Sequence, residues 1–208
     1  MRFQNAAVAG RELAVSLNKL RGANDTIVIA VVSGGVFVAA EVARELQLPF
    51  ELLFIRRLLA PFGPQNVLCA MSVAGNVVVD DELSQRAAAN EIEYVVADGI
   101  RQLTEGAQFC RDGRPPVDLH GKRVVLVDNG IHTGSTVLIA IRAVRKLEPK
   151  EIVVAVPVAD PASRDVIEQA ADAVVCLAWP EKFGHVGLWY EEFVRPTDEQ
   201  ILRLYLAQ

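Results

Sequence analysis

The sequence is poor in cysteine and histidine, the residues that most often hold soft metals or form disulfides. Its three cysteines, Cys69, Cys110 and Cys176, lie far apart, form no C-x-x-C pair and are odd in number. The three histidines show no metal-ligand spacing either. We therefore expect reduced, mostly buried thiols in a cytoplasmic protein.

Long apolar runs and a basic excess are also missing. The most apolar segment, Thr26 to Ala40, is too short to span a bilayer and is interrupted by Gly34-Gly35. The opening MRFQNAAVAGREL lacks the apolar stretch of a signal peptide. Because 26 acidic residues outnumber 21 basic ones, the formal net charge is -5, and no basic field attracts nucleic acid. We expect no membrane partner and no nucleic-acid partner.

The chain does have enough apolar residues for one sizeable core, at 51% of 208 residues. Predicted strands and helices alternate, which is typical of a doubly wound α/β fold with a mainly parallel sheet covered on both faces. The expected strands are 27–32, 51–55, 124–127, 152–156 and 173–177, and the expected helices are 6–20, 36–46, 83–110, 137–147, 162–171 and 198–206. A proline- and glycine-rich stretch predicts an irregular loop over 58–75, before a possible short strand at 77–79. Residues 111–121 are expected to connect into the strand at 124.

The most informative run is VVLVDNGIHTGST, Val124 to Thr136. Its first four residues are typical of a parallel strand buried on both faces, and Asp128 follows at the carboxyl end of that strand. The segment Thr133-Gly134-Ser135-Thr136 can place backbone N–H groups and three hydroxyls around a phosphate at the positive end of the next helix. A turn without a ligand would leave this hydroxyl-rich loop unexplained. The run predicts a phosphate and sugar site.

A second turn follows the strand at 27–32. Ser33-Gly34-Gly35 can bring N–H groups close to an anion, although a tight connection without a ligand explains it equally well. Ligands of open α/β sheets bind where the chain order of the strands reverses. We therefore expect the ends of strands 27–32 and 124–127 to face each other across the binding crevice.

The run from Val124 to Thr136 closely resembles the phosphoribosyl pyrophosphate signature of the type I phosphoribosyltransferases. In that family two acids contact the ribose hydroxyls, whereas here Asp128 is followed by Asn129, whose amide carries no charge. Two further segments, IAVVSGGVFVAAEVARELQLPFELLFIRRL and EKFGHVGLWYEEF, resemble predicted bacterial members with an RGGVP-like turn and a GLWYEDF-like C-terminus. The resemblance covers essentially the whole chain.

The resemblance implies a pyrophosphate site at Ser33, Gly34 and Gly35, with Arg57 at a position where relatives carry lysine. Arg56 is either part of this site or a solvated neighbour. Relatives have arginine where this chain has Ser33 and an acid where it has Gln65, and they also differ at Phe37 and Cys69. Several changes thus gather at one expected site.

The resemblance also suggests where the accepting base lies. His132 occupies a position where purine-salvage members carry an aspartate proposed to handle the base proton, and an imidazole can accept a proton. A solvent-facing loop histidine is the alternative. Phe183, Trp189 and Tyr190 are candidates to stack on a base, or else Trp189 and Phe193 pack the terminal segment onto the core.

Taken together, the resemblance implies one domain over 1–208, with a core at about 24–180 and a small hood from about 1–22 and 181–208. The implied activity is transfer of a phosphoribosyl group to a nitrogen nucleophile, with Mg²⁺ holding the pyrophosphate and Asp128 as a metal ligand. Asp128, Asn129 and His132 are the candidate catalytic residues. A catalytically weakened member that binds phosphoribosyl pyrophosphate or a nucleotide as a sensor is the alternative. We also expect a homodimer, because so apolar a chain should hide some of its surface.

Overall fold

The computed structural model describes residues 2–32, 34–59, 67–71, 77–79 and 117–207, together with 97, 98, 101, 104, 105 and 109. For 56–59, 67–71 and 77–79 only the backbone is described. Strands are β1 Thr26–Val32, β2 Phe50–Phe54, β3 Arg56–Leu59, β4 Val67–Met71, β5 Val77–Val79, β6 Arg123–Val127, β7 Glu151–Val158 and β8 Ala173–Ala178. Helices are α1 Ala6–Ser16, α2 Val36–Leu46, α5 Ser135–Arg145, α6 Arg164–Ala170 and α7 Asp198–Leu206, with 3₁₀ turns at Asn18–Leu20, Pro161–Ser163 and Val186–Trp189.

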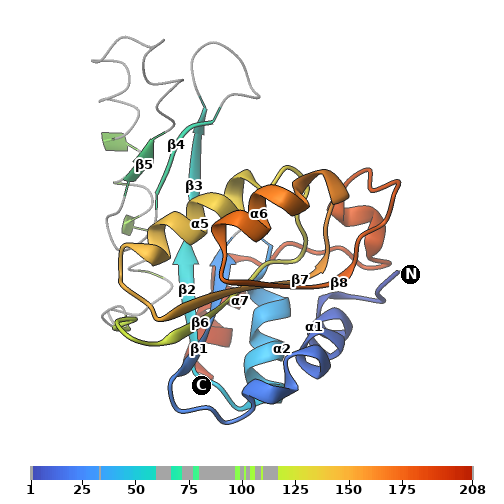
Figure 1. Ribbon diagram of the computed structural model, residues 1–208, viewed down its shortest axis with the longest axis horizontal. Coiled ribbons are helices and arrows are strands. Elements are labelled where there is room, and N and C mark those ends of the chain that lie inside the picture. Colours follow the sequence, from blue (N-terminus) through green and yellow to red (C-terminus); the bar gives the residue numbers. More distant parts are fainter. Residues whose placement is uncertain are drawn as a thin grey trace.

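Five of the strands form one parallel sheet in the order β2-β1-β6-β7-β8 (Figure 1). In register, Val28 lies between Phe50 on β2 and Val125 on β6. Chain order reverses between β1 and β6, because β1 pairs with β2 on one side and with β6 on the other. The carboxyl ends of these two strands therefore flank the position where such sheets bind ligands, as the sequence predicted.

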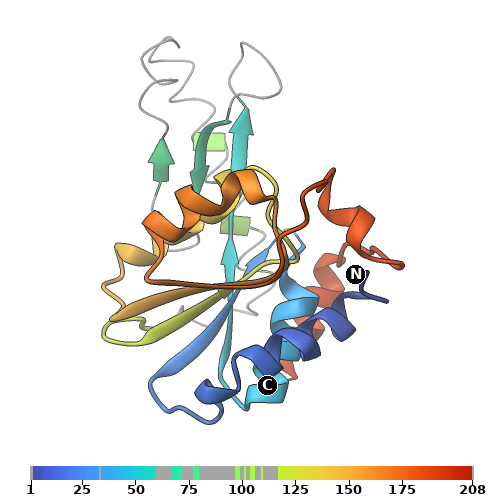
Figure 2. The same ribbon diagram turned by 45° about the vertical axis from the view of Figure 1, so that its right-hand side comes forward.

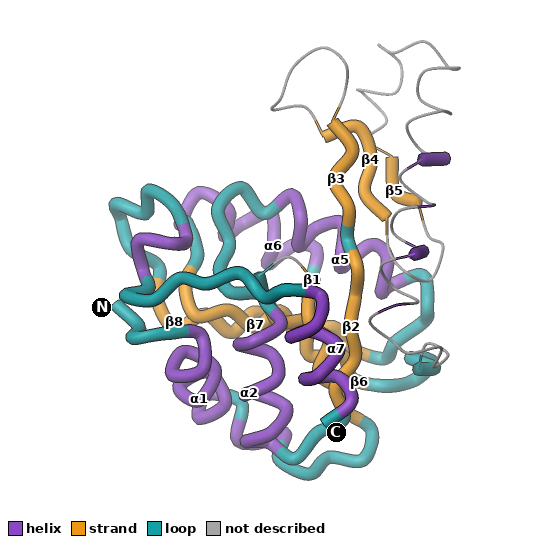
Figure 3. The backbone as a smooth tube through the Cα atoms, turned by 180° about the vertical axis from the view of Figure 1, so that it is seen from behind, coloured by secondary structure: helices purple, strands orange, loops and turns teal. Residues whose placement is uncertain are grey.

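Helices cover both faces of this sheet. Figure 1 shows α5 and α6 on one face, and Figure 3 shows α1, α2 and α7 together on the other. Alternate strand residues enter separate cores: Val28 and Ala30 pack with α1 and α2, whereas Ile27 and Ile29 pack with α5. Apolar strand residues on both faces are what a buried parallel sheet requires, and the predicted doubly wound α/β class is confirmed.

The remaining strands form a small antiparallel sheet, β3-β4-β5. The prediction of an irregular loop over 58–75 was wrong in part, since β3 includes Leu58 and Leu59 and β4 occupies 67–71. Leu58-Leu59 and the run VLCAM are apolar segments that favour strands. The prolines and glycine that signal a turn lie between these two segments and not within them. Arg56 and Arg57 open β3, which is separated from the end of β2 at Phe54 by Ile55 alone. The short strand at 77–79 is confirmed.

Most other predicted elements lie close to their expected bounds. The helices at 36–46 and 198–206 are confirmed residue for residue. The helix expected over 6–20 breaks into α1 and a 3₁₀ turn, and the one expected over 162–171 begins with a 3₁₀ turn at Pro161. The segments at 83–110 and 111–116 lie largely outside the described residues.

The two terminal segments lie side by side, as Figure 2 shows near the N-terminus. Phe3 forms a parallel bridge with Tyr190, and its N–H donates to the Trp189 carbonyl at 2.8 Å. Phe3, Phe183 and Tyr190 then pack in a buried cluster with Ala9 and Val158. The division into a core and a hood stays a prediction. Within the described part of the chain, every helix is too short or too polar to cross a membrane.

Candidate functional site

A cleft of about 490 Å³ lies at the carboxyl ends of the central strands. It brings together the Gly-Gly turn after β1, the whole loop after β6 and part of the C-terminal segment. Of the predicted site residues, the lining includes Gly34, Asp128, Asn129, His132, Thr133, Gly134, Ser135 and Thr136. It also includes Gly130, Ile131, Val137, His185, Val186, Gly187, Phe193 and Arg195.

The loop that opens α5 presents uncapped backbone N–H groups to this cleft. Gly134 adopts a left-handed conformation (φ 81°, ψ -14°) and begins the helix without a side-chain cap. The first helical bond runs from the Leu138 N–H to the Gly134 carbonyl, 2.9 Å. Among the described residues, no hydrogen bond is made to the N–H groups of Ser135, Thr136 or Val137. The first turn of any helix leaves such donors without intrahelical partners, and a ligand can satisfy them.

Other helices of the chain close the same donors with their own side chains. Asn5 caps α1 by accepting the Val8 N–H at 3.1 Å. Thr197 and Gln200 form a capping box at the start of α7. Two further helices, α2 and α6, also begin without a side-chain cap. What distinguishes the open start of α5 is that its first residues, Ser135, Thr136 and Val137, line the cleft.

Hydroxyl groups accompany these N–H donors. The Thr133 and Ser135 hydroxyls lie 3.0 Å apart within hydrogen-bond reach of each other, and the Thr133 side chain is exposed. Hydroxyls can rotate to donate to an anion. The arrangement suits a phosphate monoester held by neutral donors and by the positive end of α5.

Asp128 and Asn129 form the floor of the site beside the loop. Asp128 is buried, with 6% of its surface exposed, and its Oδ1 accepts the Asn129 N–H at 2.8 Å. Both side chains line the cleft, so their oxygens and amide are placed to hydrogen-bond a polyhydroxy ligand.

The two glycines after β1 permit a close approach to this floor. A Cβ on Gly35 would lie 2.7 Å from the Asp128 Cα, and a Cβ on Gly34 would lie 2.1 Å from the Asn129 Nδ2. At Gly35 the contact is with backbone, so this position requires glycine, whereas a side chain at Gly34 would have to displace the Asn129 amide. Gly35 also begins α2 without a side-chain cap. Ser33 lies outside the described residues.

Tyr190 holds the backbone of Asn129 in place. Its phenol donates to the Asn129 carbonyl at 2.5 Å, across 61 residues of sequence. Burial, reinforced by the charge of Asp128, raises the pKa of Tyr190 well above its usual range, so the phenol remains a donor. Sequence reasoning assigned Tyr190 to base stacking and had no signal for this hydrogen bond. The structure shows a positioning contact instead of a place in the cleft wall.

Two of the predicted aromatic residues, Phe183 and Trp189, form a stack with His132. The His132 ring lies on Phe183, with centroids 5.6 Å apart, and Phe183 lies near-parallel to Trp189 at 6.4 Å. The Trp189 Nε1 donates to the Phe183 carbonyl at 3.0 Å. Phe183, Trp189 and Tyr190 are outside the residues that line the cleft, so their contact with a base stays a prediction, and their packing fits the alternative structural role.

Several residues of the C-terminal segment line the site although sequence reasoning did not assign them to it. His185, Phe193 and Arg195 line the cleft, and Arg195 forms no ion pair with a described residue. His185 and Phe193 belong to the segment EKFGHVGLWYEEF, whereas Arg195 lies beyond it. They reach the cleft because the segment is anchored through Tyr190.

Metal ligands are sparse. The described residues contain no group of three or more histidine, cysteine, aspartate or glutamate side chains suited to a metal ion. Asp128 is the one carboxylate among the described residues that line the cleft. The Arg57, Gln65 and Cys69 side chains lie outside the described parts of the chain.

Comparison with known proteins shows the family to which this chain belongs. The family model of the phosphoribosyl transferase domain matches residues 2–191. Two curated proteins of Mycobacterium tuberculosis strains, each with a provisional phosphoribosyl transferase name, are 34% identical over 205 residues, which is 96% of this chain. The chain spans 45% of the length of those relatives.

Solved structures show the same fold. The crystal structure of TT1426 from Thermus thermophilus is 34% identical, with a TM-score of 0.87, and covers 100% of this chain and 99% of its own. A hypoxanthine-guanine phosphoribosyltransferase (hpt-2) from Bacillus anthracis shares the fold at 18% identity, with a TM-score of 0.50 over 90% of this chain and 89% of its own. The chain therefore belongs to the phosphoribosyl transferase domain family and has the type I phosphoribosyltransferase fold.

Proposed function

We propose that this protein binds phosphoribosyl pyrophosphate and transfers its phosphoribosyl group to a nitrogen nucleophile such as a purine- or pyrimidine-like base. The observation that carries the proposal is the uncapped start of α5 beside Asp128, in a cleft at the strand-order reversal. A ligand that joins a phosphate to a sugar matches neutral anion donors next to hydroxyl-binding groups.

Most of the predicted site residues have a role in this proposal. The loop 133–136 holds the 5′-phosphate, and Asp128 with Asn129 holds the ribose hydroxyls. Gly34, Gly35 and Ser33 hold the pyrophosphate, with Arg57 supplying positive charge. His132 faces the same cleft and accepts the proton of the nucleophile.

Magnesium fits this site as an ion that arrives with the substrate. Mg²⁺ is usually held by one or two carboxylates together with substrate phosphates and water, rather than by a cage of protein ligands. Asp128 is the lining carboxylate that would hold it. When bound, the ion offsets the negative charge of the departing pyrophosphate.

A second function, binding without turnover, is favoured by one observation: an amide stands where the family carries its second acid. Asn129 supplies no negative charge to a cationic ribosyl transition state, and Ser33 supplies no positive charge to pyrophosphate. One electrostatic contact of this kind is worth roughly 2.7–4 kcal/mol in related deletions. Two together lower the rate by about four to six decades if they add, since each 1.36 kcal/mol is tenfold.

Pyrophosphate release in the presence of phosphoribosyl pyrophosphate, Mg²⁺ and adenine, guanine, hypoxanthine or uracil tests the proposal. We expect slow turnover that rises in the Asn129→Asp, Ser33→Arg double variant. Binding of phosphoribosyl pyrophosphate with no turnover in either protein supports the sensor function instead. Robust wild-type activity that the double substitution leaves unchanged or lowers contradicts the assigned roles of Asn129 and Ser33.

A further inference from the structure

We infer that Asp160 is a positioning residue for His132, which accepts the proton that the nucleophile loses. The inference rests on the proposed function, because it assigns a partner to the residue that handles the proton there. It concerns nucleophiles that carry an N–H on the reacting nitrogen, such as the ring nitrogens of bases. Asp160 lies beyond the end of β7 and was not singled out by any sequence motif.

Backbone hydrogen bonds bring the two residues together. Ile131 and Ala159 form an isolated parallel bridge that extends the pairing of β6 and β7 beyond both strands. The Ile131 N–H donates to the Val158 carbonyl at 3.0 Å, and the Asp160 N–H donates to the Ile131 carbonyl at 2.8 Å. His132 and Asp160 each follow a bridged residue directly, so the main chain itself sets their separation.

The carboxylate of Asp160 is held in one orientation. Its Oδ1 accepts the Ala162 N–H at 2.9 Å and so caps the 3₁₀ turn Pro161–Ser163. The Ser163 hydroxyl donates to the Asp160 carbonyl at 2.7 Å. With Oδ1 occupied, Oδ2 lies 3.8 Å from the His132 Nε2. The Asp160 side chain is 24% exposed, so water screens this contact only in part.

The imidazole is held from a second direction. Its ring stacks on the buried Phe183 ring, with an interplanar angle of 21°. Nε2 faces Asp160, and the His132 Nδ1 has no hydrogen bond to a described residue. Nδ1 is thus the ring nitrogen left to meet a ligand, on a side chain that lines the cleft and is 57% exposed.

The geometry supports a balanced proton transfer. A carboxylate beside Nε2 favours the neutral ring that carries its proton on Nε2, which leaves the Nδ1 lone pair to act as a base. The nitrogen–C1 bond forms while the C1–oxygen bond breaks, with its electron pair leaving on pyrophosphate. The proton of the nucleophile passes to Nδ1, and Asp160 stabilises the resulting imidazolium. Three other charged or titratable residues line the cleft among the described residues. Asp128 lies on the same loop after β6 as His132, and His185 and Arg195 belong to the C-terminal segment.

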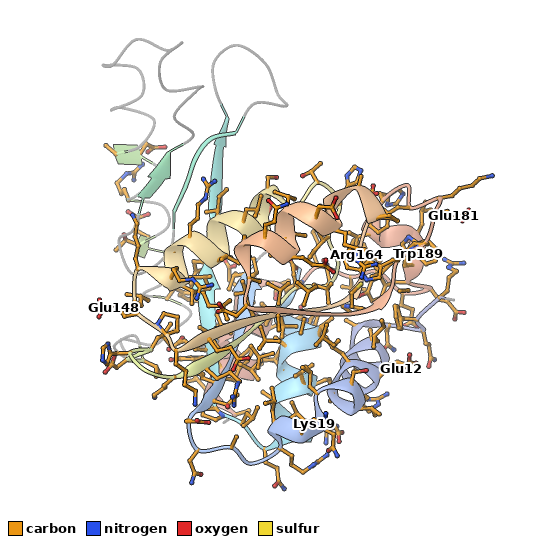
Figure 4. All side chains as sticks on the ribbon, in the orientation of Figure 1. Glu12, Lys19, Glu148, Arg164, Glu181 and Trp189 are labelled. Carbon is orange, nitrogen blue, oxygen red and sulfur yellow. The ribbon has the colours of Figure 1, made fainter. Side chains whose placement is uncertain are left out.

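A purely structural role for Asp160 makes a different prediction. As a cap, asparagine is about as good as aspartate, because its side-chain oxygen accepts the same N–H. Asp160→Asn therefore keeps the cap and removes the charge, whereas Asp160→Ala removes both. Glu148→Gln is the matched control, because Glu148 also pairs with a histidine: it lies 3.2 Å from the His120 Nδ1, and both side chains are exposed. Figure 4 shows Glu148 on the opposite side of the molecule from Trp189.

Steady-state kinetics with phosphoribosyl pyrophosphate and the best base of the panel form the first test. General-base catalysis contributes about 10²- to 10⁴-fold, so we expect Asp160→Asn to lower kcat by roughly 10- to 100-fold with the KM for phosphoribosyl pyrophosphate unchanged. The loss should shrink for a base whose reacting nitrogen is already ionised at the assay pH. Glu148→Gln should leave kcat unchanged. Full activity in Asp160→Asn, with loss only in Asp160→Ala, overturns the inference in favour of capping.

Nitrogen-15 NMR of the histidine rings is the second test, and it does not depend on turnover. We expect neutral His132 to carry its proton almost entirely on Nε2 in the wild type, and to shift in Asp160→Asn towards the tautomer mixture of the exposed His185. An unchanged tautomer ratio overturns the inference even if the enzyme is active. If phosphoribosyl pyrophosphate does not bind at all, the proposed function fails, while the NMR result still decides whether Asp160 orients His132.

Discussion

Gly134→Ala tests the phosphate loop at its most constrained position. A Cβ at residue 134 would lie 3.5 Å from two Ile167 carbons and 3.7 Å from the Ser163 Cβ, which is ordinary van der Waals contact. Sterically, alanine therefore fits, and the remaining penalty comes from the backbone, because φ is 81°. An L-residue in this left-handed region costs about 1–2 kcal/mol.

That strain should appear as lost affinity for phosphate. Thr133 next to the glycine is exposed, and the loop lines an open cleft, so the free loop can relax away from positive φ in the variant. Binding then has to restore the strained conformation that aligns the N–H groups of 135–137. A penalty of about 1–2 kcal/mol corresponds to a factor of about 5–30. We expect the Kd for AMP, measured by isothermal titration calorimetry, to rise by that factor.

Gly22→Ala is the matched control. Gly22 has φ 65° and lies in the turn before β1, away from the cleft lining, and a methyl group at this position would meet no described atom within 4 Å. The substitution should lower the free energy of unfolding by about 1–2 kcal/mol and leave AMP affinity within about twofold, well below the roughly 1.4 kcal/mol of a tenfold change. Equal AMP affinity in Gly134→Ala and Gly22→Ala would refute a phosphate site built on the backbone of this loop.

Three further predictions concern the rest of the molecule. Tyr190→Phe keeps the packing but removes the donor to the Asn129 carbonyl, so urea denaturation should show a loss of about 1–3 kcal/mol; an unchanged midpoint would contradict the positioning role. Burial raises the pKa of the Cys176 thiol to about 11, so alkylation at pH 8, followed by mass spectrometry, should be about a hundredfold slower in the native than in the unfolded chain. Because the unfolded thiol ionises first, this group lowers stability as pH rises from about 9 to about 11. Finally, the exposed Leu188 and Val194 fit a two-fold dimer, and sedimentation that shows only a 22.6 kDa species at micromolar concentration would count against it.

The parts of the fold that local sequence determines were predicted well. The apolar run at Val124 to Val127 has the composition of a strand buried on both faces, and it lies at the centre of the sheet. The terminal helix has its predicted bounds because Thr197 and Gln200 cap it from within four residues. The glycine turn that opens a helix at 133–136 was predicted from spacing, although α5 begins at Ser135 and so includes Ser135 and Thr136 in its first turn.

Contacts between distant segments were beyond sequence reasoning. Tyr190 lies 61 residues from the carbonyl to which it donates, and Asp160 meets His132 only because β6 and β7 pair beyond their ends. The antiparallel pairing of β3 with β4 was missed because the prolines and glycine led to the prediction of one long loop over 58–75, while two short strands stabilise each other only when paired. Positions such as Arg195 carry no motif and enter the site through the fold of the C-terminal segment.

The most direct test of the central claim is calorimetric titration with ribose 5-phosphate and, in parallel, with ribose. The two ligands share the sugar that Asp128 and Asn129 would hold and differ in the phosphate assigned to residues 133–136. We predict that ribose 5-phosphate binds, that ribose shows no measurable binding at the same concentrations, and that Gly134→Ala weakens only the former. Equal binding of both ligands, or no binding of ribose 5-phosphate, would contradict the assignment of this cleft as a phosphoribosyl site.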